Sequence, residues 1–226
     1  MGGNMIEQEI QKLKERITAY AAFTSRMIEE SITGLIDRDE TILNKVIKEE
    51  EEKANHIEIE IEELCIEVIA RYEPKAKNLR TVLMIIKINN DLERIGDEAV
   101  NIAQSSLYLI KKPEIKKLID IPRMAELSAK MLKDSIDAFV TENSSLAREI
   151  CTRDDTVDNL RDQVVRELAT YMIADPSTIE RALQLMRIAR SLERVADLST
   201  NFCEDVVFIV EGKNIKHHIE EETSTS

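Results

Sequence analysis

The sequence predicts an all-α protein of six long helices, arranged as a tandem repeat of two three-helix bundles. Turn-forming residues are scarce, with 5 glycines and 4 prolines in 226 residues, so few positions interrupt a helix. Apolar residues recur every three or four positions through six separate stretches, which is the spacing of one helix face. Similar motifs return after about 100 residues, which indicates a duplicated unit.

The three helices of the first half are bounded by breaks in this apolar spacing. The first covers residues 6–35 and ends where DRDE interrupts the pattern. The second covers 43–72, because Pro74 disfavours helical backbone in the residue before it. The third covers 82–109 and stops at Pro113. Short connections between them predict an up-down-up bundle.

The second half repeats this scheme after the segment KKPEIKKLIDIP. Its helices cover 124–139, 146–168 and 185–209. The middle helix ends at ADPS, whose Asp or Ser can cap the next helix, and Gly212 is a natural C-cap for the last one.

Paired motifs place the two halves in register. MIEESITGLI matches MLKDSIDAFV at a separation of 104 residues, and the prolines that precede the third helix of each half lie 102 residues apart. We therefore predict a first bundle at 5–112, a second bundle at 118–212 and a polar tail at 213–226.

Charge and cysteine usage exclude several classes of function. A formal charge of −13 argues against nucleic acid and anionic lipid as partners, and suits a cation or a basic protein surface. The three cysteines are scattered and show no C-x-x-C spacing, which is typical of a reducing cytoplasm. The charged N-terminus has no signal-peptide pattern, and the longest apolar run, VLMII, cannot cross a bilayer. These features predict a cytoplasmic protein without direct membrane insertion.

The sequences LERIGD and LERVAD each place a glutamate and an aspartate four residues apart. Glu93 and Asp97 therefore share one face of the third helix, and Glu193 and Asp197 share the matching face of the sixth. Small and apolar residues lie on the same stripes, so neither is a plain solvent face.

The fifth helix carries a second acidic pair, Asp154 and Asp158, again four residues apart. Packed against the sixth helix, it would bring four carboxylates to one seam. Burying each charge costs several kcal/mol, so the carboxylates must hold protons or be neutralised by cations. Oxygen ligands suit hard or borderline cations such as Mg²⁺, Mn²⁺ or iron.

The first half offers a weaker equivalent of this pair. Glu51 and Asn55 align with it at a separation of 103 residues, although a register longer by one residue removes the match. Asparagine is a neutral and poorer ligand, so we expect weaker binding there. Glu52 and His56, also four residues apart, could substitute.

A plainer interpretation stands beside the metal hypothesis. Arg94 and Arg194 lie three residues before Asp97 and Asp197, so ion pairs along each helix could neutralise both aspartates at the surface. The occurrence of the motif in both halves, on stripes with small residues, favours the metal interpretation.

Three stretches, DLERIGDEAVNIA, SLERVADLSTNFCEDV and RDDTVDNL, resemble the repeated E(D)xxxD signatures of the PhoU family, the phosphate-uptake regulators. The resemblance covers nearly the whole chain. It implies a cytoplasmic and commonly dimeric helical protein that is a negative regulator of phosphate-starvation signalling. Such proteins connect the ATPase subunit of a phosphate ABC transporter to a sensor histidine kinase.

The resemblance also implies metal binding on the acidic motifs, with iron, Zn, Mn or Mg as the candidate ions. Asn55 departs from the family's aspartate, so it and Glu51 are carried over less securely. The ligands implied are Glu93, Asp97, Glu193, Asp197, Asp154 and Asp158, with Glu51 and Asn55 in the first half.

Catalytic patterns are absent from the sequence. A di-iron bundle needs Glu-x-x-His motifs, and none of His56, His217 and His218 has a glutamate three residues earlier. There is also no G-x-S-x-G and no phosphate-binding loop. We therefore expect a protein that is not an enzyme, and the alternative to a metal-binding regulator is a metal-free helical adaptor that binds partners through its acidic faces.

Overall fold

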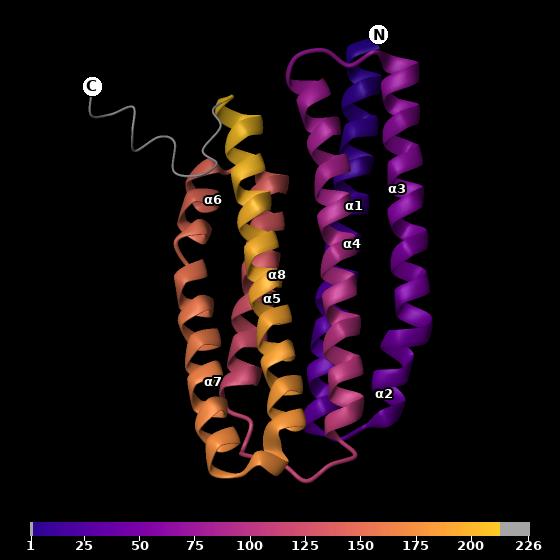
Figure 1. Ribbon diagram of the computed structural model, residues 1–226. Helices are drawn as coiled ribbons and strands as arrows, with labels where there is room; N and C mark the ends of the chain where they lie inside the picture. Colours follow the sequence, from indigo (N-terminus) through magenta and orange to yellow (C-terminus); the bar gives the residue numbers. More distant parts are fainter. Residues whose placement is uncertain (1, 213–226) are drawn as a thin grey trace, which may run out of the picture.

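The computed structural model describes residues 2–212, so the predicted polar tail at 213–226 lies outside the described residues. It confirms an all-α protein built from six long helical columns (Figure 1). The first half consists of α1 (Gly2–Ile36), α2 (Glu40–Lys45), the π-helical segment η1 (Val46–Glu50), α3 (Glu51–Tyr72) and α4 (Lys77–Leu109). The second half consists of α5 (Asp120–Thr141), α6 (Ser144–Cys151), α7 (Asp154–Ala174), the short 3₁₀ helix η2 (Pro176–Thr178) and α8 (Ile179–Glu211).

Capping residues mark several of the helix ends. After α1, Asp39 caps α2 by accepting hydrogen bonds from the N–H groups of Thr41 and Ile42. Asp175 accepts from the N–H of Ser177 at the turn before α8, so the aspartate of ADPS provides the predicted cap. Gly212 ends α8 with φ of 72°, the left-handed conformation that favours glycine at this position.

The middle column differs between the two halves. In the first half α2, η1 and α3 follow one another without a break. In the second half the predicted single helix is divided into α6 and α7 at Thr152 and Arg153. The Thr152 hydroxyl donates to the carbonyl of Glu149 at 2.7 Å, a local bond that competes with the helical ladder. The break places Asp154 in the first turn of α7.

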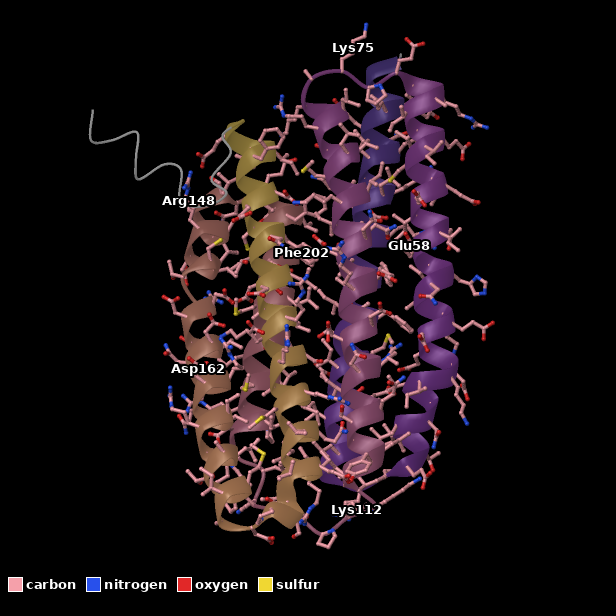
Figure 2. All side chains as sticks on the ribbon, in the orientation of Figure 1. Glu58, Lys75, Lys112, Arg148, Asp162 and Phe202 are labelled. Carbon is pink, nitrogen blue, oxygen red and sulfur yellow. The ribbon has the colours of Figure 1, made fainter. Side chains whose placement is uncertain are left out.

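The two bundles pack together along their inner columns. Figure 1 shows α3 at one edge and α6–α7 at the other, with α1, α4, α5 and α8 between them. α4 packs on α8 and α1 packs on α5. Apolar residues of both halves, such as Leu92 and Phe202, are fully buried. Figure 2 shows Phe202 in this interior.

A buried ion pair crosses from one bundle to the other. Lys87 on α4 donates to both carboxylate oxygens of Asp205 on α8, each at 2.7 Å, and Asp205 is 2% exposed. Tyr108 near the far end of α4 donates to Glu180 at the start of α8, so the two helices run antiparallel. None of the described helices combines the length and the apolar character that crossing a lipid bilayer requires.

Candidate functional site

The structure forms an acidic face between α7 and α8. We call Asp154, Asp158, Glu193 and Asp197 the α7–α8 face, since the first two lie on α7 and the last two on α8. Burial, together with the nearby charges of Asp197, Asp158 and Glu193, raises the pKa of Asp154 to about 7. Four predicted carboxylates therefore lie close enough to repel one another.

Two carboxylate oxygens of this face lack a hydrogen-bond donor. Asp154 Oδ1 and Asp158 Oδ1 are buried and accept no hydrogen bond among the described residues. The side chain of Asp158 is nevertheless 42% exposed, so the face opens to solvent on one side. A buried carboxylate oxygen without a donor is costly, and a proton or a cation removes that cost.

One arginine offsets part of this negative charge. Arg161 on α7 lies 3.7 Å from Asp158, and its charge lowers the pKa values of Glu193 and Asp197. Burial raises both of those pKa values, and the neighbouring carboxylates add to it. The net result is a face that favours protonation or cation binding over four free carboxylates.

The ion pairs of the plainer interpretation form only in part. Arg194 Nη1 lies 4.0 Å from Asp197 Oδ2, and both side chains are more than a third exposed, so this pair contributes little. In the first half Arg94 pairs with Asp91 at 3.2 Å. The salt bridges among the described residues do not include one between Arg94 and Asp97.

The first half forms a second and different face between α3 and α4. We call Asn55, Glu58, Glu93 and Asp97 the α3–α4 face. Asn55, Glu58 and Glu93 line one open hollow of about 420 Å³. Figure 2 shows Glu58 on the side of α3 that faces α4. Burial raises the pKa of Glu93, and the charges of Asp97 and Glu58 raise it further.

A buried tyrosine lies beneath this second face. Tyr20 on α1 is 1% exposed, and its hydroxyl has no hydrogen-bond partner among the described residues. Burial raises its pKa, and the charges of Glu93, Glu58 and Asp97 add to that effect. A neutral phenol with a free O–H is a hydrogen-bond donor from which a carboxylate can accept.

The burial pattern agrees with the predicted separation of 103 residues. Ala54 and Ile61 on α3 are buried, as are Val157 and Val164 on α7. This register pairs Asn55 with Asp158, as predicted, and it also pairs Glu58 with Arg161.

The other predicted acidic residues of α3 lie at the margin of the α3–α4 face or outside it. Glu51 is half-buried in the first turn of α3, one turn before Asn55. Glu52 and His56 lie 4.0 Å apart with side chains 76% and 77% exposed, so this pair faces solvent and does not substitute in the face.

Sequence reasoning missed Glu58 and Tyr20. Glu58 lies three residues after Asn55, so extending the acidic stripe by one turn would have found it. Tyr20 looks like any core residue, and only the fold brings its hydroxyl to Glu93 and Asp97.

Neither face is a closed ligand cluster. Among residues 2–212, no three side chains of His, Cys, Asp or Glu are arranged as a group that could hold a metal ion. The chemistry of the α7–α8 face nevertheless fits a cation, because it offers four acidic side chains and two buried oxygens without donors. The α3–α4 face fits less well, since Asn55 is neutral.

Known proteins resemble this chain in sequence and in fold. A family model described as "PhoU domain" matches residues 17–106 and 121–206, one segment in each half. The chain belongs to the PhoU family. It is 37% identical over 215 residues to the "Phosphate-specific transport system accessory protein PhoU homolog" of Aquifex aeolicus (strain VF5), covering 95% of this chain and 97% of that protein.

Solved PhoU structures share the fold. The crystal structure of PhoU from Pseudomonas aeruginosa matches with a TM-score of 0.87 and 32% identity, covering 92% of this chain and 99% of that one. The "phosphate transport system regulatory protein PhoU" from Streptococcus pneumoniae matches with a TM-score of 0.85 and 25% identity, covering 93% and 99%. Each matched PhoU segment of this chain contains one of the two LER(I/V)(G/A)D motifs.

Two thiols adjoin the α7–α8 face. Cys203 on α8 is fully buried, and Cys151 ends α6, three residues before Asp154. A hydrogen bond between the two thiols and burial raise the pKa of Cys203, so this group keeps its proton. A protonated buried thiol is a poor metal ligand.

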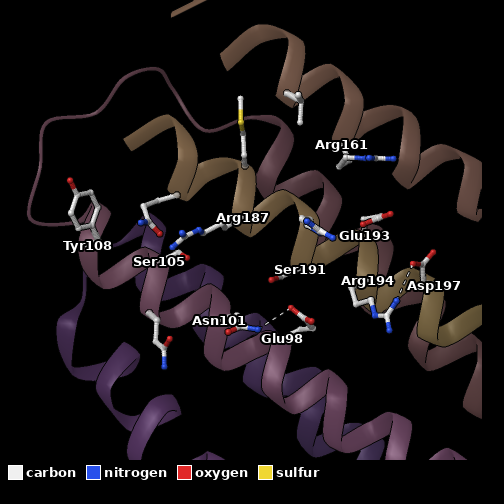
Figure 3. A pocket seen from close by; sticks show the side chains of 15 residues that line it. Glu98, Asn101, Ser105, Tyr108, Arg161, Arg187, Ser191, Glu193, Arg194 and Asp197 are labelled. Carbon is white, nitrogen blue, oxygen red and sulfur yellow. Dashed lines mark hydrogen bonds and ion pairs between the residues drawn. The ribbon is translucent and has the colours of Figure 1, made fainter. Parts of the chain in front are cut away.

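A groove of about 1070 Å³ runs between α4 and α8 and continues over α8 to α7 (Figure 3). Its walls are polar and carry four arginines, although the whole chain has a net charge of −13. Its charged lining residues are Arg161, Arg187, Arg190, Arg194, Glu98, Glu193 and Asp197.

Proposed function

We propose that this chain is a cytoplasmic, dimeric negative regulator of phosphate uptake and phosphate-starvation signalling. It couples the ATPase subunit of a phosphate ABC transporter to a sensor histidine kinase and catalyses no reaction itself. Membership of the PhoU family supports this role most directly, together with relatives named as accessory proteins of the phosphate-specific transport system. Two acidic faces on a strongly negative chain supply surfaces for basic partner segments or cations.

The regulatory role can be tested in a bacterial strain that lacks its own PhoU protein. Expression of this chain should restore repression of a phosphate-starvation reporter in phosphate-rich medium. Affinity purification from the same cells should recover the transporter ATPase subunit and the histidine kinase. A reporter that stays active while folded protein accumulates would contradict the proposal.

We also propose that the α7–α8 face holds a divalent or trivalent cation. The observation that supports this is the pair of buried oxygens, Asp154 Oδ1 and Asp158 Oδ1, that lack donors. Glu193 and Asp197 would complete an oxygen set from the second helix. Such a set suits Mg²⁺, Mn²⁺ or iron better than zinc, which prefers histidine and cysteine. A bound cation would neutralise the mutual repulsion and join α7 to α8.

Metal content and thermal stability test this second proposal separately. The purified protein should contain metal that a chelator removes, and adding Mn²⁺ or Fe²⁺ to the chelated protein should raise its melting temperature. Absence of both effects would favour the metal-free adaptor. Among residues 2–212 no three side chains form a closed ligand group, and this observation supports the metal-free adaptor as the alternative.

A further inference from the structure

We infer that the groove between α4 and α8 binds a phosphate-type oxyanion through its arginines. The groove shares Glu193 and Asp197 with the α7–α8 face at one end, and the inference concerns the arginines and serines of the remaining part. The relevant walls are α4 from Glu98 to Tyr108 and α8 from Gln184 to Arg194.

The groove gathers hydrogen-bond donors that the protein leaves unused. Arg187 and Arg190 form no hydrogen bond or salt bridge among the described residues, and neither do the hydroxyls of Ser105 and Ser191. All four residues line the groove. Figure 3 places Arg187 beside Ser105, one reaching from α8 and the other from α4. Arg187 and Arg190 are exposed to solvent, so their donors are available to an acceptor-rich ligand that enters the groove.

Small residues create the space for that ligand. Ser105 and Ser191 are each 6% exposed and lie where α4 and α8 pack together. Because serine has a short side chain, the two helices can pack closely here while the long arginine side chains rise at the rim. The hydroxyls then lie deep in the groove and the guanidinium groups nearer its mouth.

Local charge favours an anion in spite of the negative chain. Glu98 accepts a hydrogen bond from Asn101 at 3.2 Å, and the charge of Arg190 lowers the pKa of Glu193. Figure 3 places Glu193 and Asp197 toward the other end of the groove from Arg187. The groove lining carries four arginines against three carboxylates, so its formal charge is positive, and at physiological salt charges more than about 8 Å away are largely screened. Guanidinium groups bind phosphate oxygens in a bidentate manner, which adds specificity to the charge attraction.

The size of the groove indicates a ligand larger than one phosphate group. Ten residues of helix span about 15 Å, and the volume is about 1070 Å³. Inorganic phosphate, pyrophosphate and the phosphate chain of a nucleotide share the chemistry that these donors recognise. Several charges on one ligand can engage Arg187, Arg190 and Arg194 together, so we expect affinity to rise with the number of phosphates.

Isothermal titration of the full chain, chelated and at low salt, tests this inference. Phosphate, pyrophosphate and ATP are titrated in separate arms, with sulfate as the control for charge and shape. We expect saturable binding that is tightest for the multiply charged ligands. Pyrophosphate as tight as ATP identifies the phosphate chain itself as the ligand, whereas much tighter ATP binding assigns the site to a nucleotide.

Matched variants locate the binding. Arg187→Gln with Arg190→Gln should weaken binding at least about tenfold, because each charged hydrogen bond contributes 1.5 kcal/mol or more. Arg166→Gln on α7 is the control, since Arg166 is exposed, lies outside the groove and forms no salt bridge among the described residues. Circular dichroism confirms that each variant is folded. No saturable binding, equal binding of sulfate, or equal loss in the Arg166 variant would overturn the inference.

Discussion

The two acidic faces occupy equivalent places in the duplicated fold, yet they differ in the helix that faces the LER motif. α4 and α8 keep the glutamate and aspartate four residues apart. On the opposite helix, Asn55 in the first half stands where Asp158 stands in the second, and Glu58 stands where Arg161 stands. The first face is therefore closed by an amide and a glutamate, and the second by an aspartate and an arginine.

Because of this difference, the buried groups that lack a partner are of different kinds in the two faces. In the α7–α8 face the repulsion is concentrated on Asp154, whose pKa rises to about 7. In the α3–α4 face Asp97 is exposed, and the Tyr20 hydroxyl beneath it is a buried donor without a hydrogen-bond partner among the described residues. A buried carboxylate oxygen attracts a cation, whereas a phenol can satisfy a carboxylate without one. Both halves of the duplicated fold therefore keep the LER motif, whereas the residues on the helix that faces it differ.

The largest effect that we expect is loss of metal binding from the second half alone. Asp154→Asn with Asp158→Asn should weaken cation binding by more than about tenfold, because loss of outer-shell partners alone typically costs 10- to 100-fold. Glu93→Gln with Asp97→Asn, which removes the two LER-motif carboxylates of the first half, should have a much smaller effect. Equilibrium dialysis with Mn²⁺ measures both, and equal losses would break the asymmetry.

The pH dependence of stability should also separate the faces. The pKa of Asp154 is raised from its ordinary value of 3.8 to about 7, so the folded state binds a proton that the unfolded state releases. The stabilisation is complete below pH 3.8 and is lost as pH rises through 7. In chelated protein, the free energy of unfolding should therefore fall between about pH 4 and about pH 7.

Asp154→Asn should flatten that slope, while Asp97→Asn should change it less. Denaturant titrations at several pH values measure the slope for each variant. Metal affinity should show the opposite trend and rise with pH, because binding a cation displaces the Asp154 proton. A wild-type slope that Asp154→Asn leaves unchanged would rule out this residue as its source.

Removing the charged residue that faces each LER motif, on α7 or on α3, should change cation affinity in opposite directions in the two halves. Arg161→Gln removes a positive charge beside Asp158 and should tighten cation binding about fivefold, as expected for roughly 1 kcal/mol. Glu58→Gln removes a negative charge beside Glu93 and should weaken any binding at the α3–α4 face. The same dialysis measurement applies, and a weaker site in the Arg161 variant would contradict the electrostatic explanation.

The smallest effect that we expect is a change in stability when the glycine of the first LER motif is replaced by the alanine found in the second. Gly96 stands where the second half has Ala196, and an added Cβ would meet Ala54 Cβ at 3.7 Å, an ordinary contact. Gly96→Ala should therefore stabilise the fold by about 1 kcal/mol through helix propensity. Gly34→Ala is the contrast, since its Cβ would lie 2.6 Å from Leu43 Cδ2. It should cost about 1–3 kcal/mol by overpacking. Thermal unfolding measures both changes.

Most of the fold could be predicted from the sequence, because apolar spacing and helix-stopping residues are local signals. Pro74 and Gly212 marked helix ends that the structure confirms within a few residues. The break at Thr152 was missed, since a hydroxyl that bonds its own backbone leaves no trace in the apolar pattern.

The site was predicted less completely, because it depends on which helices pack together. The spacing of Glu193 and Asp197 fixed their common face, and the repeat led to Asp158. Tyr20 and the donors of the α4–α8 groove come together only through tertiary packing. Ser105 and Ser191 are ordinary serines in the sequence, and their importance follows from the antiparallel contact of α4 with α8.

The most direct test of the central claim is a crystal structure of the protein grown with Mn²⁺ and measured for anomalous scattering. We expect an anomalous peak between the carboxylates of α7 and α8, stronger than any peak at the α3–α4 face. A peak confined to the first half, or anomalous density at neither face with all four carboxylates turned to solvent, would contradict the account.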